Sequence, residues 1–177
     1  ESIKAIHPLK NGVISSYKAT QAMVRYFINK LGGPIRLFRP EIMVSVPAGI
    51  TSTEKRSLID ACISAGAKSA YVIKEPIAAA LGAGVPIAKA IGHMVINIGG
   101  GTSEIAVISL GDIVASSSLR IGGNEMDEAI VNYVRKKYNL IIGVSAAENL
   151  KIKAGSALKP KKNEGLEITG SNSITGL

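Results

Sequence analysis

The sequence predicts an α/β protein, on three observations. In the first half, short apolar segments alternate with segments of helical period, an order that favours parallel pairing of the strands. The second half begins with three apolar segments separated by glycine turns, which indicates a strand meander followed by a helix. With 46% hydrophobic and 19% charged residues, the 177-residue chain is able to bury a core. We expect the two halves to meet near residues 85 to 92.

Composition and charge bear on the kind of partner and compartment. Aromatic residues make up 4% of the chain and Trp is absent, which disfavours stacking on nucleic-acid bases. The net charge of +8 allows an anionic partner, although ordinary solvated lysines explain it equally well. Cys62 is the one cysteine, so a reducing compartment is the default. The first residues carry neither an initiator Met nor a signal peptide, as expected for a mature chain or a fragment.

The first 18 residues are expected to be irregular, with a turn at Asn11–Gly12. Thr20 is expected to cap a helix that stops at Gly32–Gly33. The remainder of the first half predicts a strand, a helix, a second strand and a second helix. Thr51 and Glu54 form a capping box for the first of these helices. Gly66 suits the end of that helix, Pro76 fits the first turn of the second, and the strands are expected at Ile42–Val46 and Ala70–Ile73.

A loop between the first helix and the first strand carries an apolar pair flanked by cations. Leu37 and Phe38 lie between Arg36 and Arg39. Such a pair is suited to the interface of a membrane. A loop that tucks both side chains into the core has the same composition, and composition alone favours it.

In the second half, Gly111–Asp112 predicts a tight turn between two strands. Asn124 is a suitable N-cap for the helix that follows, and Ser145 with Glu148 predicts a capping box for another. From Lys159 onward no helix or strand pattern is visible. The strands flanking the turn are expected at Ala106–Ser109 and Ile113–Leu119, and the first helix carries Met126, Ile130, Val134 and Tyr138 at helical spacing.

A glycine turn is the main candidate for binding chemistry. Gly99, Gly100, Gly101 and Thr102 lie between two apolar segments. Adjacent glycines allow backbone N–H groups to approach phosphate oxygens closely, and Thr102 adds a hydroxyl. Hairpins also use glycine for purely structural reasons. The turn matches neither a P-loop nor a dinucleotide-binding fingerprint, because a strand follows it.

Three further features allow a structural and a functional interpretation. Glu75 precedes a helix that starts with proline, where an acid is favoured in any case, but where a carboxylate could also orient water or a metal-bound water. Gly122–Gly123 precedes a helix N-terminus that could approach a phosphate or ribose. Glu148 and Lys151 share one helical face and could touch one ligand, although Glu148 is explained equally well by capping.

The order of these segments is more specific than any one of them. The chain runs through EPIAAALGAG, VINIGGGT, IGGNEMDEAI and AENLK, which resembles the layout of the actin-like ATPase superfamily. Longer stretches, such as GGGTSEIAVISLGDIV and IGGNEMDEAIVNYVRKKYNLIIG, closely resemble the MreB family of bacterial cell-shape actins. The resemblance runs over nearly the whole chain.

This resemblance implies an actin-like (ribonuclease H-like) ATPase fold, here partial and in two lobes, with ATP and Mg²⁺ in the cleft. Residues 1–90 would belong to the first lobe (subdomain IA), with a membrane-type loop at 36–39. Residues 91–157 would form the core of the second lobe (subdomain IIA), and 158–177 the start of small subdomain IIB. The family forms filaments, usually double and antiparallel, on the cytoplasmic face of the cell membrane, with cell-shape or cell-envelope proteins as partners and no nucleic acid.

The resemblance also assigns roles to residues. Glu75 would position the attacking water, and Thr102 is the second residue placed in catalysis. Gly99, Gly100, Gly101 and Thr102 would wrap the β- and γ-phosphates. Leu37 and Phe38 would insert into the membrane. The remaining nucleotide contacts would come from Gly122, Gly123, Glu148, Asn149, Leu150 and Lys151, the last four against the adenosine.

Some residues depart from the family pattern. Asn97 stands where the family has an Asp that helps to hold Mg²⁺, and an amide brings no negative charge to a hard cation. Lys74 and Lys153 replace acids, and Ser103 replaces a frequent Thr. We expect weaker metal retention and slower hydrolysis, with phosphate binding retained. A first phosphate loop and half of the cleft are missing relative to the family, so hydrolysis by these residues alone is not expected. A scaffold without hydrolysis, a sugar or acetate kinase and a chaperone ATPase are the alternatives.

Overall fold

The computed structural model describes residues 6–32, 38–158 and 165–176. The chain divides into two compact units, Glu1–Arg120 and Ile121–Leu177. The division falls later than the junction expected near residues 85 to 92. The reason is a shared core, in which Ala80 and Ile87 pack with Ala106 and Ile108. The assignment of residues 1–90, 91–157 and 158–177 to family subdomains stays a prediction.

The first unit begins with a short hairpin where irregular structure was expected. Strands β1 (Leu9–Lys10) and β2 (Val13–Ile14) pair antiparallel. Asn11 and Gly12 both adopt positive φ, at 50° and 75°, as a type I′ turn requires. The sequence therefore located the turn, but not the strands that it joins.

Helix α1 (Tyr17–Gly32) begins three residues before the predicted cap. Thr20 lies inside the helix, where it is buried and its hydroxyl donates to the Pro8 carbonyl at 3.2 Å. The Ser16 hydroxyl accepts from the Ala19 N–H at 3.4 Å, which is the bond of a helix cap. The predicted end of the helix at Gly32 is confirmed.

A strand, helix and strand follow, as predicted. Strands β3 (Glu41–Val46) and β4 (Ser69–Lys74) pair parallel in register, with helix α2 (Ser52–Ser64) as the crossover. The capping box is confirmed: the Thr51 hydroxyl accepts from the Glu54 N–H at 3.2 Å, and the Glu54 carboxylate accepts from the Thr51 N–H at 2.9 Å. Gly66, with φ 116°, follows the end of α2.

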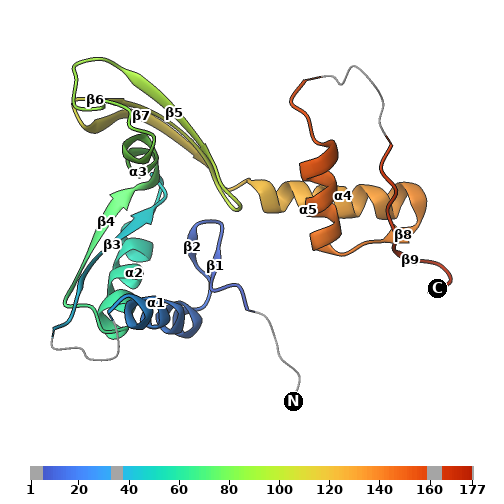
Figure 1. Ribbon diagram of the computed structural model, residues 1–177, viewed down its shortest axis with the longest axis horizontal. Helices are drawn as coiled ribbons and strands as arrows, with labels where there is room; N and C mark the ends of the chain where they lie inside the picture. Colours follow the sequence, from blue (N-terminus) through green and yellow to red (C-terminus); the bar gives the residue numbers. More distant parts are fainter. Residues whose placement is uncertain (1–5, 33–37, 159–164, 177) are drawn as a thin grey trace. The chain divides into compact units, whose positions relative to one another are not determined.

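Helix α3 (Glu75–Gly82) leads to a three-stranded antiparallel meander, β5 (His93–Ile98), β6 (Ser103–Ser109) and β7 (Asp112–Leu119). One face of this sheet packs on α3, which lies beneath it in Figure 1. The turn between β6 and β7 is Leu110–Gly111, with φ 52° and 80°, one residue before the predicted position. The other face of the sheet presents exposed apolar side chains, among them Met94, Ile96, Ile98 and Ile105.

The second unit consists of helices α4 (Gly123–Tyr138) and α5 (Val144–Ala154) with strands β8 (Leu140–Ile141) and β9 (Ser171–Asn172). Its core is built on Val134, Ile142 and Ala147. The pairing of β8 with β9 is antiparallel and places a strand in the segment after Lys159, where none was predicted.

Both predicted helix caps of this unit are wrong. Helix α4 has Gly122 as its N-cap, and the Glu125 carboxylate accepts from the Gly122 N–H at 2.8 Å, so Asn124 lies inside the helix. Helix α5 has Gly143 as its N-cap, so Ser145 is already helical and makes no capping box with Glu148. Within the described residues, no helix is long and apolar enough to span a membrane.

Candidate functional site

The glycine turn is the hairpin connection between β5 and β6. The Gly99 N–H donates to the Thr102 carbonyl at 2.8 Å, which closes the turn. The amides of Gly100 and Gly101 have no bond to another described residue. Thr102 is buried, with 5% of its surface exposed. Two amides of the loop are therefore available for an anion, whereas the amide of Gly99 is used by the turn itself.

The Asn11–Gly12 turn packs against the Gly99–Thr102 loop. A Cβ added to Gly101 would lie 2.9 Å from the Asn11 Cα and 3.0 Å from its backbone nitrogen. A Cβ added to Gly12 would lie 2.6 Å from the Pro47 Cγ and 3.1 Å from the Thr102 Cγ2. Glycine is required at position 101 because a Cβ there would meet the Asn11 backbone, and at position 12 because φ is +75° and the Pro47 side chain leaves no room. The sequence signalled the turn at Asn11–Gly12, but nothing in it showed what the turn contacts.

Glu75 and Asn97, both predicted for the site, lie together. Glu75 is the first residue of α3, directly after β4, and Asn97 is on β5. The Asn97 amide nitrogen donates to a Glu75 carboxylate oxygen at 3.4 Å. Burial raises the pKa of Glu75 above its ordinary value, and the negative charge of Glu104 raises that pKa further.

Glu104 is a member of the site that the sequence analysis missed. Its exposed fraction is 0%, and its Oε1 accepts from the Ala48 N–H at 2.6 Å. Its Oε2 is buried without a hydrogen-bond partner among the described residues. In the sheet, Glu104 lies opposite Asn97 on one side and Ser118 on the other. The available signal was an acid on the face of β6 that also carries Ala106 and Ile108, because an acid on a buried face calls for an explanation.

The donor atoms of this site fit a hard cation. No group of three His, Cys, Asp or Glu gathers among the described residues. Instead, the Glu75 carboxylate accepts from the Asn97 amide, Glu104 lies opposite Asn97 in the sheet, and the second carboxylate oxygen of Glu104 has no hydrogen-bond donor among the described residues. Oxygen ligands of this kind suit Mg²⁺. Lys74, one of the departures from the family pattern, is exposed.

In the second unit, the predicted ligand contacts lie around the start of α4. Gly122 and Gly123 form its N-terminus. The ammonium of Lys151 lies 2.8 Å from Asp127 Oδ1, donates to Oδ2 at 2.9 Å and donates to the Gly123 carbonyl at 3.0 Å. Asp127 is 3% exposed, so this ion pair joins α5 to α4 inside the unit. The sequence analysis did not identify Asp127.

The rest of the predicted adenosine segment differs in exposure along α5. Glu148 and Asn149 are exposed, whereas Leu150 packs against the core of the unit. Lys153 is exposed as well. The role of Glu148 to Lys151 in adenosine binding stays a prediction, with Lys151 already engaged by Asp127.

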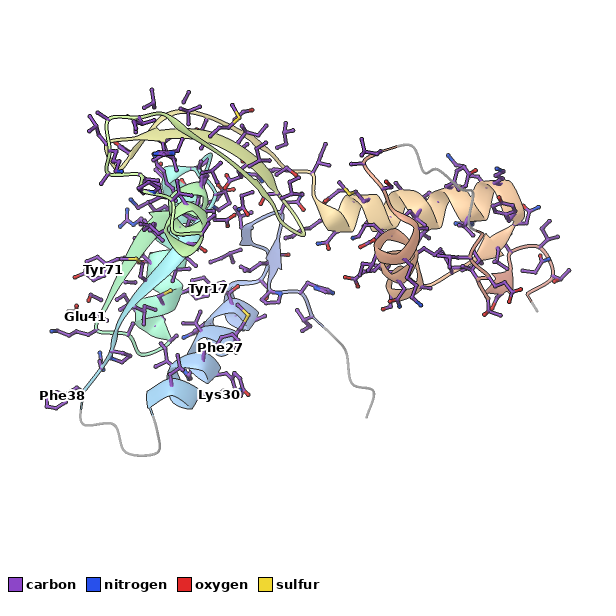
Figure 2. All side chains as sticks on the ribbon, turned by 45° about the horizontal axis from the view of Figure 1, so that its top comes forward. Tyr17, Phe27, Lys30, Phe38, Glu41 and Tyr71 are labelled. Carbon is purple, nitrogen blue, oxygen red and sulfur yellow. The ribbon has the colours of Figure 1, made fainter. Side chains whose placement is uncertain are left out.

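Of the expected membrane pair, Leu37 lies outside the described residues. Phe38 is 87% exposed and projects away from the ribbon (Figure 2). It also lines an apolar groove of about 760 Å³ between α1 and β3. The core position that composition favoured is therefore wrong for Phe38. The other apolar residues of the groove include Met23, Phe27, Leu31 and Met43.

Comparison with known proteins finds one family over the whole chain. The model of the MreB/Mbl protein family matches residues 1–177. The cell shape-determining protein Mbl of Bacillus cereus is 44% identical over 176 residues, which cover 99% of this chain and 53% of Mbl. The cell shape-determining protein MreB of Haemophilus influenzae is 46% identical over 179 residues, which cover 99% of this chain and 51% of MreB. The chain thus spans about half the length of these relatives.

A solved structure shows the same fold. MreB5 of Spiroplasma citri, crystallised with AMPPNP, is 34% identical and superposes with a TM-score of 0.88 over 97% of this chain and 52% of MreB5. The described architecture is therefore that of actin-like proteins, as the sequence predicted.

Proposed function

This chain belongs to the MreB/Mbl family, and on that premise we propose that it is part of an ATP-binding bacterial actin homologue. The intact protein would polymerise into filaments at the inner face of the cell membrane and direct cell shape together with cell-envelope proteins. Its location would be cytoplasmic and peripheral to the membrane. A role in nucleic-acid binding is not part of this proposal.

The closed Gly99–Thr102 turn carries the proposal of ATP binding. It leaves the amides of Gly100 and Gly101 without a hydrogen bond to another described residue, next in sequence to the buried Thr102. Oriented amides of this kind bind phosphate oxygens. The relative MreB5 of S. citri has been crystallised with AMPPNP and with ADP, which supports nucleotide binding by the intact protein.

Glu75, Asn97 and Thr102 would act on the phosphate side of the nucleotide. Bound Mg²⁺ would neutralise phosphate charge, and Asn97 would contribute to holding it. Glu75 would accept a hydrogen bond from the attacking water and orient it. Because its pKa is raised, Glu75 would also be a better proton acceptor than an ordinary carboxylate. In the second unit, Gly122, Gly123 and the Glu148–Lys151 segment would contact the nucleoside.

Nucleotide binding without hydrolysis is a second candidate function. The Asn97 amide donates to Glu75 and so competes with water for that carboxylate. An Asp at this position would instead repel Glu75 and attract the cation. Slow or absent hydrolysis follows both from the hydrogen bond of Asn97 to Glu75 and from the missing negative charge at position 97. Actin-like kinases and chaperone ATPases are less well supported, because the comparisons give cell-shape proteins.

Filament formation is tested by sedimentation of the intact protein with ATP, with ADP and without nucleotide. The proposal predicts a pellet that requires ATP. No ATP-dependent pellet over a range of salt concentrations and protein concentrations would contradict it. Measurement of released phosphate in the same samples separates a filament protein that hydrolyses ATP from one that only binds it.

Membrane contact is tested by co-sedimentation of the intact protein with liposomes. Phe38→Ser is expected to reduce the bound fraction, because Phe38 is 87% exposed next to further apolar side chains. Leu158→Ser is the control, since Leu158 is 81% exposed in the second unit and is given no membrane role. Equal binding of wild type and Phe38→Ser would refute the contact.

A further inference from the structure

Glu104 is a charged side chain that the fold buries completely. Its carboxylate accepts one hydrogen bond, from the Ala48 N–H, while the second oxygen has no partner among the described residues. A buried carboxylate is normally paired or fully hydrogen-bonded, because desolvation of the charge is costly. The single bond to Ala48 explains one oxygen of Glu104 and leaves the other unexplained.

The surroundings of Glu104 add negative charge instead of compensating it. Asn97, the residue opposite Glu104 in the sheet, donates its amide to Glu75, so a second carboxylate lies near Glu104. The ion pairs found among the described residues join Lys68 to Glu41, Arg120 to Glu54 and Lys151 to Asp127, and none includes Glu75 or Glu104. Neither carboxylate is therefore compensated by a basic side chain of the described residues.

The position of Glu104 favours a cation. It faces Asn97 across the β5–β6 pair, and Asn97 in turn bonds to Glu75. Glu104 also follows Thr102, the last residue of the glycine loop, by two positions. Resting on the proposed function, we propose that Glu104 binds the divalent cation that accompanies the nucleotide and supplies the negative charge that Asn97 lacks. The affinity of this chain for the cation is then higher than the replacement of Asp by Asn97 alone would give.

The experiment measures Mn²⁺ binding by electron paramagnetic resonance in the intact protein saturated with AMPPNP. Glu104→Gln keeps an oxygen acceptor for the Ala48 N–H and removes the charge. We expect Mn²⁺ affinity to fall about 10- to 100-fold. Glu41→Gln is the control, because it removes a negative charge from an exposed ion pair of the same unit and should leave Mn²⁺ affinity unchanged.

A compensating variant separates charge from shape. If Glu104 acts through its charge, Asn97→Asp combined with Glu104→Gln should restore most of the lost Mn²⁺ affinity. If Glu104→Gln does not fold by circular dichroism, Glu104→Asp takes its place. The shorter side chain withdraws the carboxylate from the site and is likewise expected to weaken Mn²⁺ binding.

Three results would overturn the proposal. Unchanged Mn²⁺ affinity in folded Glu104→Gln would mean that the charge of Glu104 takes no part in binding the cation. A loss that Asn97→Asp fails to restore would mean that Glu104 only holds the Ala48 turn in place. Failure of the wild-type protein to bind AMPPNP at all would overturn this proposal and the proposed function together, whereas the first two results leave nucleotide binding intact.

Discussion

Gly101→Ala tests whether the Asn11–Gly12 turn fixes the position of the glycine loop. The added Cβ would lie 2.9 Å from the Asn11 Cα and 3.0 Å from its backbone nitrogen. Both atoms belong to the backbone, so the clash is relieved only by a shift of one turn against the other. Overpacking of this kind costs about 1–3 kcal/mol.

Gly99→Ala is the matched variant in the same loop. Its added Cβ would meet the Thr102 carbonyl oxygen at 3.4 Å, which is ordinary van der Waals contact. Both variants gain about 0.4–1 kcal/mol from the lower entropy of the unfolded chain. The difference between them therefore isolates the clash with Asn11.

Urea denaturation of the intact protein, followed by circular dichroism, measures this difference. Gly101→Ala should be less stable than Gly99→Ala by about 1–3 kcal/mol at equal slopes of the unfolding curves. Equal stability of the two variants would refute the account of the supporting turn, because the loop would then have freedom to move away from Asn11.

Three further outcomes are expected. Without Mg²⁺ and nucleotide, the free energy of unfolding should fall as pH rises from the unfolded-state pKa of Glu75 through its raised folded-state pKa. Glu75→Gln should remove this fall and stabilise the protein at neutral pH by up to about 1 kcal/mol, seen as a higher Tm. A lower Tm of Glu75→Gln would contradict this expectation. Lys151→Met should cost about 3 kcal/mol by leaving Asp127 buried and unpaired, whereas the exposed Lys153→Met should change stability by less than about 0.5 kcal/mol, so similar losses in a urea titration would argue against a structural ion pair. Asn97→Asp should increase ATP-dependent phosphate release by about tenfold, and an unchanged rate would show that the missing charge does not limit hydrolysis.

Signals carried by neighbouring residues were sufficient for much of the fold. The capping box of Thr51 and Glu54 was predictable because both partners lie within one helical turn. The parallel pair β3–β4 was predictable because a helix separates two apolar segments. The meander β5–β6–β7 followed from apolar segments joined by glycine turns.

Elements that depend on distant partners were missed. Strand β9 exists only through its pairing with β8, and a polar Ser171–Asn172 segment carries no strand signal of its own. The N-caps of α4 and α5 are Gly122 and Gly143, which offer no side-chain oxygen, so neighbouring polar residues were chosen instead. The sequence pattern of Thr20 is that of a helix cap, because a sequence does not show the hydrogen bond of Thr20 to the distant Pro8 carbonyl.

The same distinction applies to the candidate site. The glycine turn, Glu75 and Asn97 were identified from the order of motifs, and the structure brings Glu75 and Asn97 together. The burial of Glu104 and the contact of the Asn11–Gly12 turn with the glycine loop were not predicted, because both depend on residues that are distant in sequence. The order of motifs along the chain does not show which residues of different strands and turns contact each other.

The central claim is that Gly99–Thr102 binds the phosphates of a nucleotide. Calorimetric titration of the intact protein and of Gly101→Ala with AMPPNP and with adenosine tests it most directly, since adenosine has no phosphates. The account predicts that Gly101→Ala weakens AMPPNP binding by about tenfold or more, as a cost of at least about 1.4 kcal/mol would, while adenosine affinity stays unchanged. Equal effects on both ligands, or no effect on either, would contradict it.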